Sequence, residues 1–327
     1  MKSRNSQITI NNKIALIIIG LLTFVPSYAH VRWFVDSSDE VLSFEWTGVY
    51  YLLIALAFVF AAVCFAVDRK LSPLYRGAFF NTWPKVDQWR LLAYGCGGTL
   101  IWISFENIFL APNIVITQDL ETYLIIQAVC GVALVSSLPP RYSGAFLFVL
   151  CFLAMDAVAA SLWIDYIFEF IAISIAFCLS HKFPSVALHV LRIGLGIQLM
   201  VLAIHNKLME PALGLEFLTL HPWNFMTMMG LEAFNDLLFV FSAGIAELTF
   251  GVLILLGIAT RLVIVVVSGF FLMTSILLGL HELVGHVPII ACCLVLFSLG
   301  GGESLFSVFT KAVEHIMSPL PVRHAEK

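Results

Sequence analysis

The sequence predicts an all-α integral membrane protein, a polytopic helical bundle. In it, two tandem four-helix units follow one extra span and a signal peptide or short N-terminal helix. The first observation is composition, because 61% of the residues are hydrophobic and only 12% are charged, whereas soluble domains have roughly 45–50% and 25%. The second is a series of apolar runs close to the ~20 residues that a transmembrane helix needs. The third is a weak internal repeat in the body of the chain.

Residues 1–29 have the features of a cleaved signal peptide, with a short, uncleaved transmembrane helix as the alternative. A basic start precedes a short apolar core at residues 14–25, and Ser27 and Ala29 occupy the small-residue positions of a cleavage site. Cleavage would make His30 the first residue, whose α-amine and imidazole together can chelate copper or zinc. The plainer interpretation is that His30 is incidental.

The next segment, residues 30–90, is expected to contain a periplasmic stretch, a span at 47–67 and a cytoplasmic loop. This loop is rich in Lys and Arg, which favour the inner side of the membrane. Eight further spans then alternate in direction, and a long outer loop is expected at 205–236. Their predicted ranges are 91–110, 123–138, 143–160, 166–179, 187–204, 237–258, 262–278 and 287–299. The distribution of cations indicates a multi-pass protein of the bacterial inner (plasma) membrane.

These spans form a first four-helix unit at residues 91–180 and a second at 187–299. Apolar and polar positions recur in the same order in both units, with an offset that grows by the length of the outer loop of the second unit. The aligned pairs include Gly97 with Gly196, Asn107 with Asn206, Gln127 with Glu247 and Gly131 with Gly251. Four helices are an even number, so the two copies would share one orientation. Residues 303–327 are expected to form a cytoplasmic amphipathic tail.

The second unit also resembles a known family. Its motif begins with Leu191-Arg192-Ile193-Gly194-Leu195-Gly196 and continues with Asn206-Lys207, Glu247, Gly251, Gly257 and Thr260-Arg261. These residues look like those of the DoxX family of small four-helix membrane proteins. The first unit is then a degenerate copy, with Ala93, Ile108 and Gln127 in place of the polar residues. The resemblance implies the fold and, from some relatives, a quinone-coupled or membrane-bound redox system, hence a membrane or periplasmic redox partner.

The stretch from Leu280 to His286 places two histidines and a carboxylate between two apolar runs. It is not the H-E-x-x-H zinc motif, because three residues separate Glu282 from His286. Glu282 and His286 are i, i+4 and would share a helix face, whereas His281 and His286 would not. We expect Gly285 to let the backbone turn so that both histidines point inward.

The candidate site therefore lies at the predicted outer mouth of the bundle. The candidate metal ligands are His30, His205, His281 and His286. The polar residues expected around them are Glu106, Asn206, Lys207, Glu247 and Glu282. Copper or zinc suits these imidazoles, and mutual hydrogen bonding without a metal is the plainer alternative. Glu247, deep within its helix, is either a proton or ligand site or a packing hydrogen bond.

Three functions remain open from the sequence. The first is a periplasm-facing His/Glu site that binds copper or zinc, and the second is a quinone- or partner-coupled redox subunit. The third is a proton-coupled transporter that uses Glu247. The chain contains no nucleophile elbow, P-loop, dinucleotide fingerprint or haem-attachment motif, so whether it is an enzyme stays open. The expected partner is the lipid bilayer, and the lack of a basic stripe argues against nucleic acid.

Overall fold

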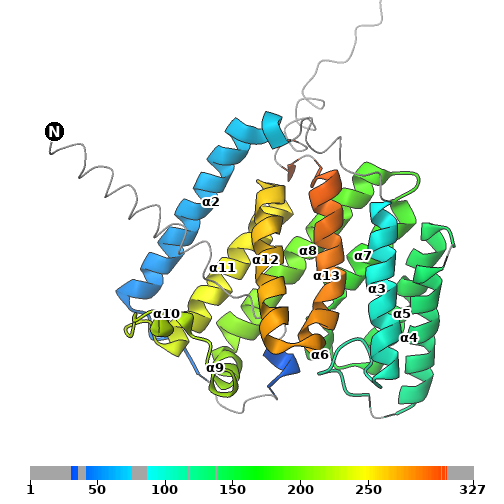
Figure 1. Cartoon of the computed structure of the whole chain (residues 1–327), viewed down its shortest axis with the longest axis horizontal. Coiled ribbons are helices and arrows are strands. Elements are labelled where there is room, and N and C mark those ends of the chain that lie inside the picture. The colour runs from blue at the N-terminus through cyan, green and yellow to red at the C-terminus, as the bar shows by residue number, and fades with distance from the viewer. Residues whose placement is uncertain are drawn as a thin grey trace, which may run out of the picture.

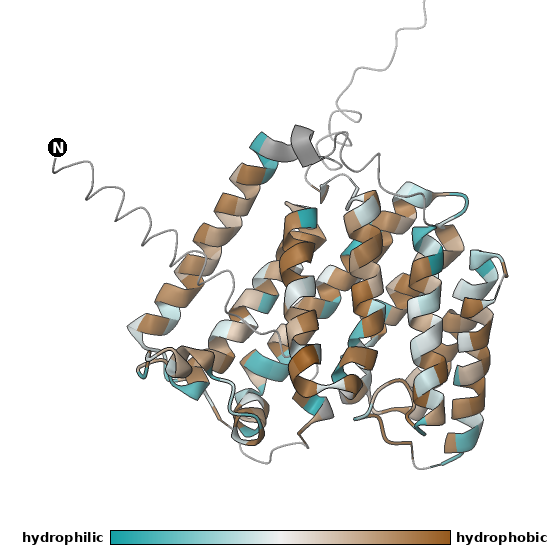
Figure 2. Cartoon of the chain, viewed as in Figure 1, coloured by the Kyte–Doolittle hydropathy of each residue, from teal (hydrophilic) through white to brown (hydrophobic). Residues whose placement is uncertain are grey.

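A computed structural model of the chain describes residues 31–35, 42–75, 87–116, 118–136, 138–302, 304–305 and 307. Within these ranges the chain forms helices, turns and connecting segments and no strand. The helices lie side by side in one bundle (Figure 1). Hydrophobic residues run along their lengths, and hydrophilic residues lie mainly toward their ends (Figure 2). The prediction of an all-α polytopic membrane bundle is confirmed.

Six helices are long and apolar enough to cross a membrane. They include helix α8, which continues directly into the π-helix η3 (Ile204–Met209). The six are α2 (Gly48–Tyr75), α5 (Pro140–Ala157), α8 (Pro184–Ala203), α11 (Asp236–Leu256), α12 (Thr260–Leu278) and α13 (Leu280–Leu299). Multi-pass insertion follows from these helices by length and composition.

Three further helices complete the two predicted units: α3 (Gln88–Phe105), α4 (Leu120–Val135) and α7 (Ile167–Leu179). They pack in the same bundle, but α4 and α7 are shorter apolar helices, and α3 includes polar Gln88, Arg90 and several glycines. The sequence predicted nine spans, so the crossing of the membrane by these three helices stays a prediction.

The helix packing follows the same order in both halves of the chain. Helix α3 packs on α4 as α8 packs on α11, and α5 packs on α7 as α12 packs on α13. The halves meet through α7 against α8 and through α13 against α3. Each half therefore begins on the last helix of the other half, which is the arrangement expected of two related units; their superposition stays a prediction.

Two glycine pairs allow close approaches between these helices. A Cβ added to Gly97 would lie 2.7 Å from the carbonyl oxygen of Gly131, and one on Gly131 would lie 2.8 Å from that of Gly97. Gly196 and Gly251 have the same reciprocal relation, at 2.8 Å in each direction. Because the obstacles are backbone atoms, only glycine fits at these crossings.

The segment at 205–236 is not the loop that was predicted. It contains η3, α9 (Pro211–Leu220) and α10 (Phe225–Met228). Pro211 starts α9 at a position where its missing N–H costs no helical bond. Leu213 and Phe217 then pack with Val31 of the short 3-10 helix η1 (Val31–Trp33), which explains why this segment folds against the bundle.

Both ends of the chain lie outside the described residues. These are the signal or first helix at 1–29 and, apart from residues 304, 305 and 307, the predicted amphipathic tail. Helix α2 contacts the bundle through α11, where Tyr50 packs edge-on against Phe241 at 4.7 Å between ring centroids. The short α6 (Ala160–Trp163) precedes the turn that carries Asp165.

Candidate functional site

The π-helix η3 supplies three consecutive polar residues, His205, Asn206 and Lys207, to the interior. A π-helix holds more residues per turn than an α-helix and is frequently found at functional sites. Asn206 and Lys207 are each only 1% exposed, and His205 is partly buried. The three side chains enter two adjacent clusters, so η3 connects them.

The first cluster surrounds the carboxyl group of Asp165, which is itself buried. His205 Nδ1 lies 2.9 Å from Oδ1, Asn206 Nδ2 donates to Oδ2 at 3.3 Å, and Arg32 Nε lies 3.5 Å from Oδ2. Arg32 also donates through Nε to Asn206 Oδ1 at 2.8 Å. Burial raises the pKa of Asp165, although His205, Arg32 and Asn206 all act in the opposite direction. The cost of desolvation therefore exceeds the stabilisation by these partners.

Two more residues hold this cluster in place. Arg32 Nη2 donates to Glu210 Oε2 at 2.7 Å, and the other carboxylate oxygen of Glu210 lies 3.5 Å from His205 Nε2. Gln198 of α8 contacts the backbone beside this cluster. Its side-chain nitrogen donates to the backbone carbonyl of Asp165, and its side-chain oxygen accepts from the backbone N–H of Glu169 at 3.2 Å. Helix α8 thus fixes the turn that precedes α7.

The second cluster is centred on a buried ion pair between Lys207 and Glu247. Lys207 Nζ lies 2.6 Å from Glu247 Oε2, and the two side chains are 1% and 2% exposed. Glu247 lies in the middle of α11, among apolar side chains such as Phe250. This is a charge-assisted hydrogen bond between two buried side chains.

Helix α13 adds a second acid and a histidine beside this pair. Glu282 Oε1 lies 3.4 Å from His286 Nε2, and both side chains are buried. Lys207 interacts electrostatically with both Glu282 and His286. The His286 ring also packs against the Phe271 ring at 4.6 Å, and Ser275 Oγ lies 3.5 Å from its Nδ1. We call Lys207, Glu247, Glu282 and His286 the buried charge cluster.

Each of the two acids in this cluster has one carboxyl oxygen that accepts no hydrogen bond from a described residue. Glu247 Oε1 and Glu282 Oε2 are buried and have no hydrogen-bond partner among the described residues. A buried acceptor without a donor is costly. Each is a place where a carboxyl proton would reduce that cost.

Several sequence predictions about this region are wrong. The helix does not turn at Gly285, because α13 is continuous from Leu280 to Leu299 and the break lies at Gly279, with a φ of 90°. Unbroken hydrogen bonding is favoured in apolar surroundings. Glu282 and His286 are also fully buried, not at a partly exposed mouth. Their sharing of one helix face is as expected from the i, i+4 spacing.

The predicted metal ligands do not assemble into one described group. His205 faces Asp165 and Glu210, whereas His286 faces Glu282. His30 and the side chain of His281 lie outside the described part of the structure. Among the side chains that are described, no three His, Cys, Asp or Glu residues are placed to hold a metal ion. Metal binding stays a prediction.

Sequence reasoning did not assign Asp165, Arg32, Gln198 and Glu210 to the site. One signal was present, because Arg32 was one of the few cations on the predicted outer side and so called for an acidic partner. Asp165 and Arg32 are far apart in sequence, and only the fold shows that they meet. Gln127, which the sequence aligns with Glu247, is buried on α4. Its amide oxygen accepts from Leu110 N at 2.8 Å and its nitrogen donates to Ile108 O at 3.0 Å.

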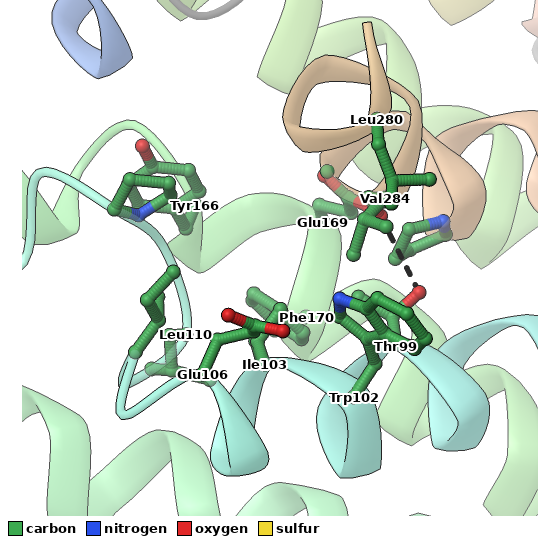
Figure 3. A pocket seen from close by; sticks show the side chains of 14 residues that line it. Thr99, Trp102, Ile103, Glu106, Leu110, Tyr166, Glu169, Phe170, Leu280 and Val284 are labelled. Carbon is green, nitrogen blue, oxygen red and sulfur yellow. Dashed lines mark hydrogen bonds between the residues drawn. The ribbon is translucent and has the colours of Figure 1, made fainter.

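Glu106 belongs to a separate pocket of about 110 Å³ between α3, α7 and α13. Trp102, Tyr166, Glu169 and Phe170 are among its lining residues (Figure 3). Leu280, Val284 and Pro288 face it from α13, so this helix presents one face to the pocket and another to the buried charge cluster.

Pro288 interrupts the hydrogen bonds of α13 beside this pocket. A proline has no N–H to donate to the carbonyl four residues earlier, here that of Val284. Thr99 Oγ1 of α3 donates to this carbonyl instead, at 3.4 Å (Figure 3). The contact joins the first helix of one half to the last helix of the other.

Comparison of the chain with protein-family models, curated proteins and solved structures finds no match. The resemblance of the second unit to the DoxX family therefore stays a prediction.

Proposed function

We propose that the protein is a proton-coupled membrane transporter in which the buried charge cluster takes up and releases protons. The observation that carries this proposal is the Lys207–Glu247 ion pair, 2.6 Å long and buried among helices long and apolar enough to cross a membrane. Ionisable groups inside transmembrane segments cost roughly 2.5–3.5 kcal/mol each on insertion scales, and they mark ion and proton pathways.

The second acid gives the ion pair an alternative partner. Lys207 neutralises Glu247 directly and also interacts with Glu282. A proton added to Glu247 would remove its negative charge and so weaken its ion pair with Lys207, and the ammonium group would then be attracted to Glu282. Because Glu247 lies on α11 and Glu282 on α13, this exchange would alter the attraction between two helices. A change of helix contacts on protonation is what proton coupling requires.

His286 lets the cluster hold a further proton. The pair Glu282–His286 is neutral overall either as a carboxylic acid with a neutral imidazole or as a carboxylate with an imidazolium. A proton can therefore pass between the two side chains without changing the net charge of the interior. Glu282 Oε1 and His286 Nε2 lie 3.4 Å apart and make no hydrogen bond to each other in this structure, so the transfer requires the two side chains to move closer.

The test is a pH jump applied to the reconstituted protein on a solid-supported membrane, which records charge displacement without any substrate. Wild-type protein is expected to give a transient current, because protons enter groups within the membrane. Glu247→Gln is expected to reduce it at least tenfold, and Glu121→Gln, at an exposed position on α4, to leave it unchanged. A wild-type current absent, or equal in Glu247→Gln, would contradict the proposal.

We place the protein in the bacterial inner membrane with the η3 end outward, since the basic residues Arg141, Lys182 and Arg261 were predicted inside. Copper or zinc binding by His30, His205, His281 and His286 is the alternative supported by residue type. A quinone-coupled redox role is supported by the DoxX resemblance. Both are tested by elemental analysis and by quinone-linked activity of the purified protein.

A further inference from the structure

The pocket between α3, α7 and α13 is not part of the buried charge cluster. Its deepest acid is Glu169, in the first turn of α7, which is 5% exposed. The backbone N–H of Glu169 is held by Gln198 at 3.2 Å, which fixes this turn of the helix. The carboxyl group lines the pocket and makes no hydrogen bond to another described residue.

The rest of the lining gives the pocket a distinct chemistry. Tyr166 and Phe170 are buried beside Glu169, while Trp102 and Glu106 are exposed and form its entrance (Figure 3). No Lys, Arg or His belongs to the described lining. Two acids and three aromatic rings thus line a space in which the described side chains supply no counter-charge.

We propose that this pocket binds a primary alkylammonium group. An ammonium group offers three N–H donors and a positive charge, which matches a carboxylate that has no donor of its own. Aromatic faces attract such cations, and the attraction is stronger when water is excluded. Glu106 at the entrance would attract the cation, and Glu169 would bind it inside.

The volume limits the size of the ligand. A cavity of 150 Å³ holds benzene, so a pocket of about 110 Å³ accommodates roughly four or five non-hydrogen atoms. Propylammonium and ethanolammonium have this size. The same ammonium chemistry occurs in free amines and in the headgroup of phosphatidylethanolamine, and the experiment must separate these sources.

The test is calorimetric titration of the detergent-purified protein with propylammonium chloride, with 1-propanol as a neutral compound of the same size. Wild type is expected to bind propylammonium saturably at one site, and 1-propanol at least tenfold more weakly. Glu169→Gln should weaken propylammonium binding at least tenfold, and Glu106→Gln, at an exposed position that does not hold the fold, severalfold. Glu121→Gln is the matched control and should bind as wild type does.

Two competition experiments with lipids show whether the site binds a lipid headgroup or a free amine. Displacement of propylammonium by phosphatidylethanolamine, and not by phosphatidylglycerol, assigns the site to the lipid headgroup, and displacement by neither assigns it to free amines. Saturable binding absent from wild type, retained in Glu169→Gln, or displaced equally by both lipids would overturn the proposal. Glu169→Gln should keep the pH-jump current, so this result is independent of the proton-coupling proposal.

Discussion

Individual residues of the buried charge cluster are stabilised by each other and not by water. Lys207 has Glu247 at 2.6 Å, and the chain around them is apolar. Removing one partner of a buried pair leaves an uncompensated charge, which costs more than the pair itself contributes. The stability of the protein should therefore depend on both residues together.

Lys207→Met and Glu247→Gln should each lower the free energy of unfolding by about 3–5 kcal/mol. The double variant should lose clearly less than the sum of the two, because it leaves no unpaired charge. Unfolding of the purified proteins in mixed micelles measures all three. Additive losses would show that the two side chains do not interact as the structure describes.

The buried carboxyl group of Asp165 is expected to make the stability of the protein depend on pH. Its pKa in the folded protein is raised by burial above its ordinary value of about 3.9. A raised pKa means that the folded state binds the proton more tightly, so this residue contributes stability at acid pH that is lost as the pH rises through the folded pKa. The charged groups facing it are Arg32 and His205, with Glu210 behind them.

In Asp165→Asn this contribution disappears. The melting temperature of the variant, followed from pH 4 to pH 7, should fall less with increasing pH than that of wild type. If the two pH profiles are parallel, Asp165 does not titrate in this range.

The sequence identified some residues of the site, but it did not show which of them contact each other. Glu247 was found because ionisable residues in apolar runs are rare. Glu282 and His286 were found because they lie between two apolar runs, and Lys207 because it belongs to the motif that resembles the DoxX family. Which of them meet could not be found, since Lys207 and Glu247 are 40 residues apart in sequence. Glu169 was not assigned to any site, because its pocket exists only once α3, α7 and α13 have packed.

At the scale of the element, helix geometry was predicted well and helix continuity less well. The i, i+4 spacing of Glu282 and His286 correctly placed them on one face. Gly285 was expected to break α13, but a single glycine inside an apolar helix only lowers its stability. The break occurs at Gly279, where a positive φ of 90° is required. The π-helix η3 left no recognisable pattern in the sequence.

The glycines at helix crossings give an element-scale prediction. Gly196→Ala should lower the free energy of unfolding by about 1–3 kcal/mol, because its Cβ would meet backbone atoms of Leu255 and Gly251 at 2.7 and 2.8 Å. Gly269→Ala is the matched control, since nothing lies within 4 Å of its Cβ on α12.

This control should be neutral or stabilise the protein by up to about 1 kcal/mol, the helix-propensity difference between the two residues. Unfolding in mixed micelles compares the two variants. Equal effects of Gly196→Ala and Gly269→Ala would mean that α8 and α11 do not approach each other as closely as the structure describes.

For the whole molecule, composition alone predicted a polytopic helical bundle, because the apolar runs are too many and too long for a soluble core. The order of helix packing matches two related units, and the aligned glycines Gly97, Gly131, Gly196 and Gly251 lie at equivalent crossings. The segment at 205–236 was missed because its short helices are stabilised by contacts with distant Val31 and Phe239 and not by a local periodicity.

The orientation of the molecule is tested by labelling single cysteines in intact cells. Cys178 is an exposed native cysteine, so a Cys178→Ser background removes its reaction. Lys182→Cys, exposed after α7, should react with a membrane-impermeant maleimide only after the cells are broken, because the basic ends of the helices are predicted to face the cytoplasm.

Glu121 is exposed at the start of α4, and an odd number of predicted spans separates it from Lys182. With α4, α5 and α7 crossing in turn, the two positions lie on opposite sides, so Glu121→Cys should react in intact cells. Labelling of both cysteines in intact cells, or of neither, would mean that one of the short helices α4 and α7 does not cross. The two units would then differ in topology, and Glu106 and the pocket that it enters would not share a side with η3.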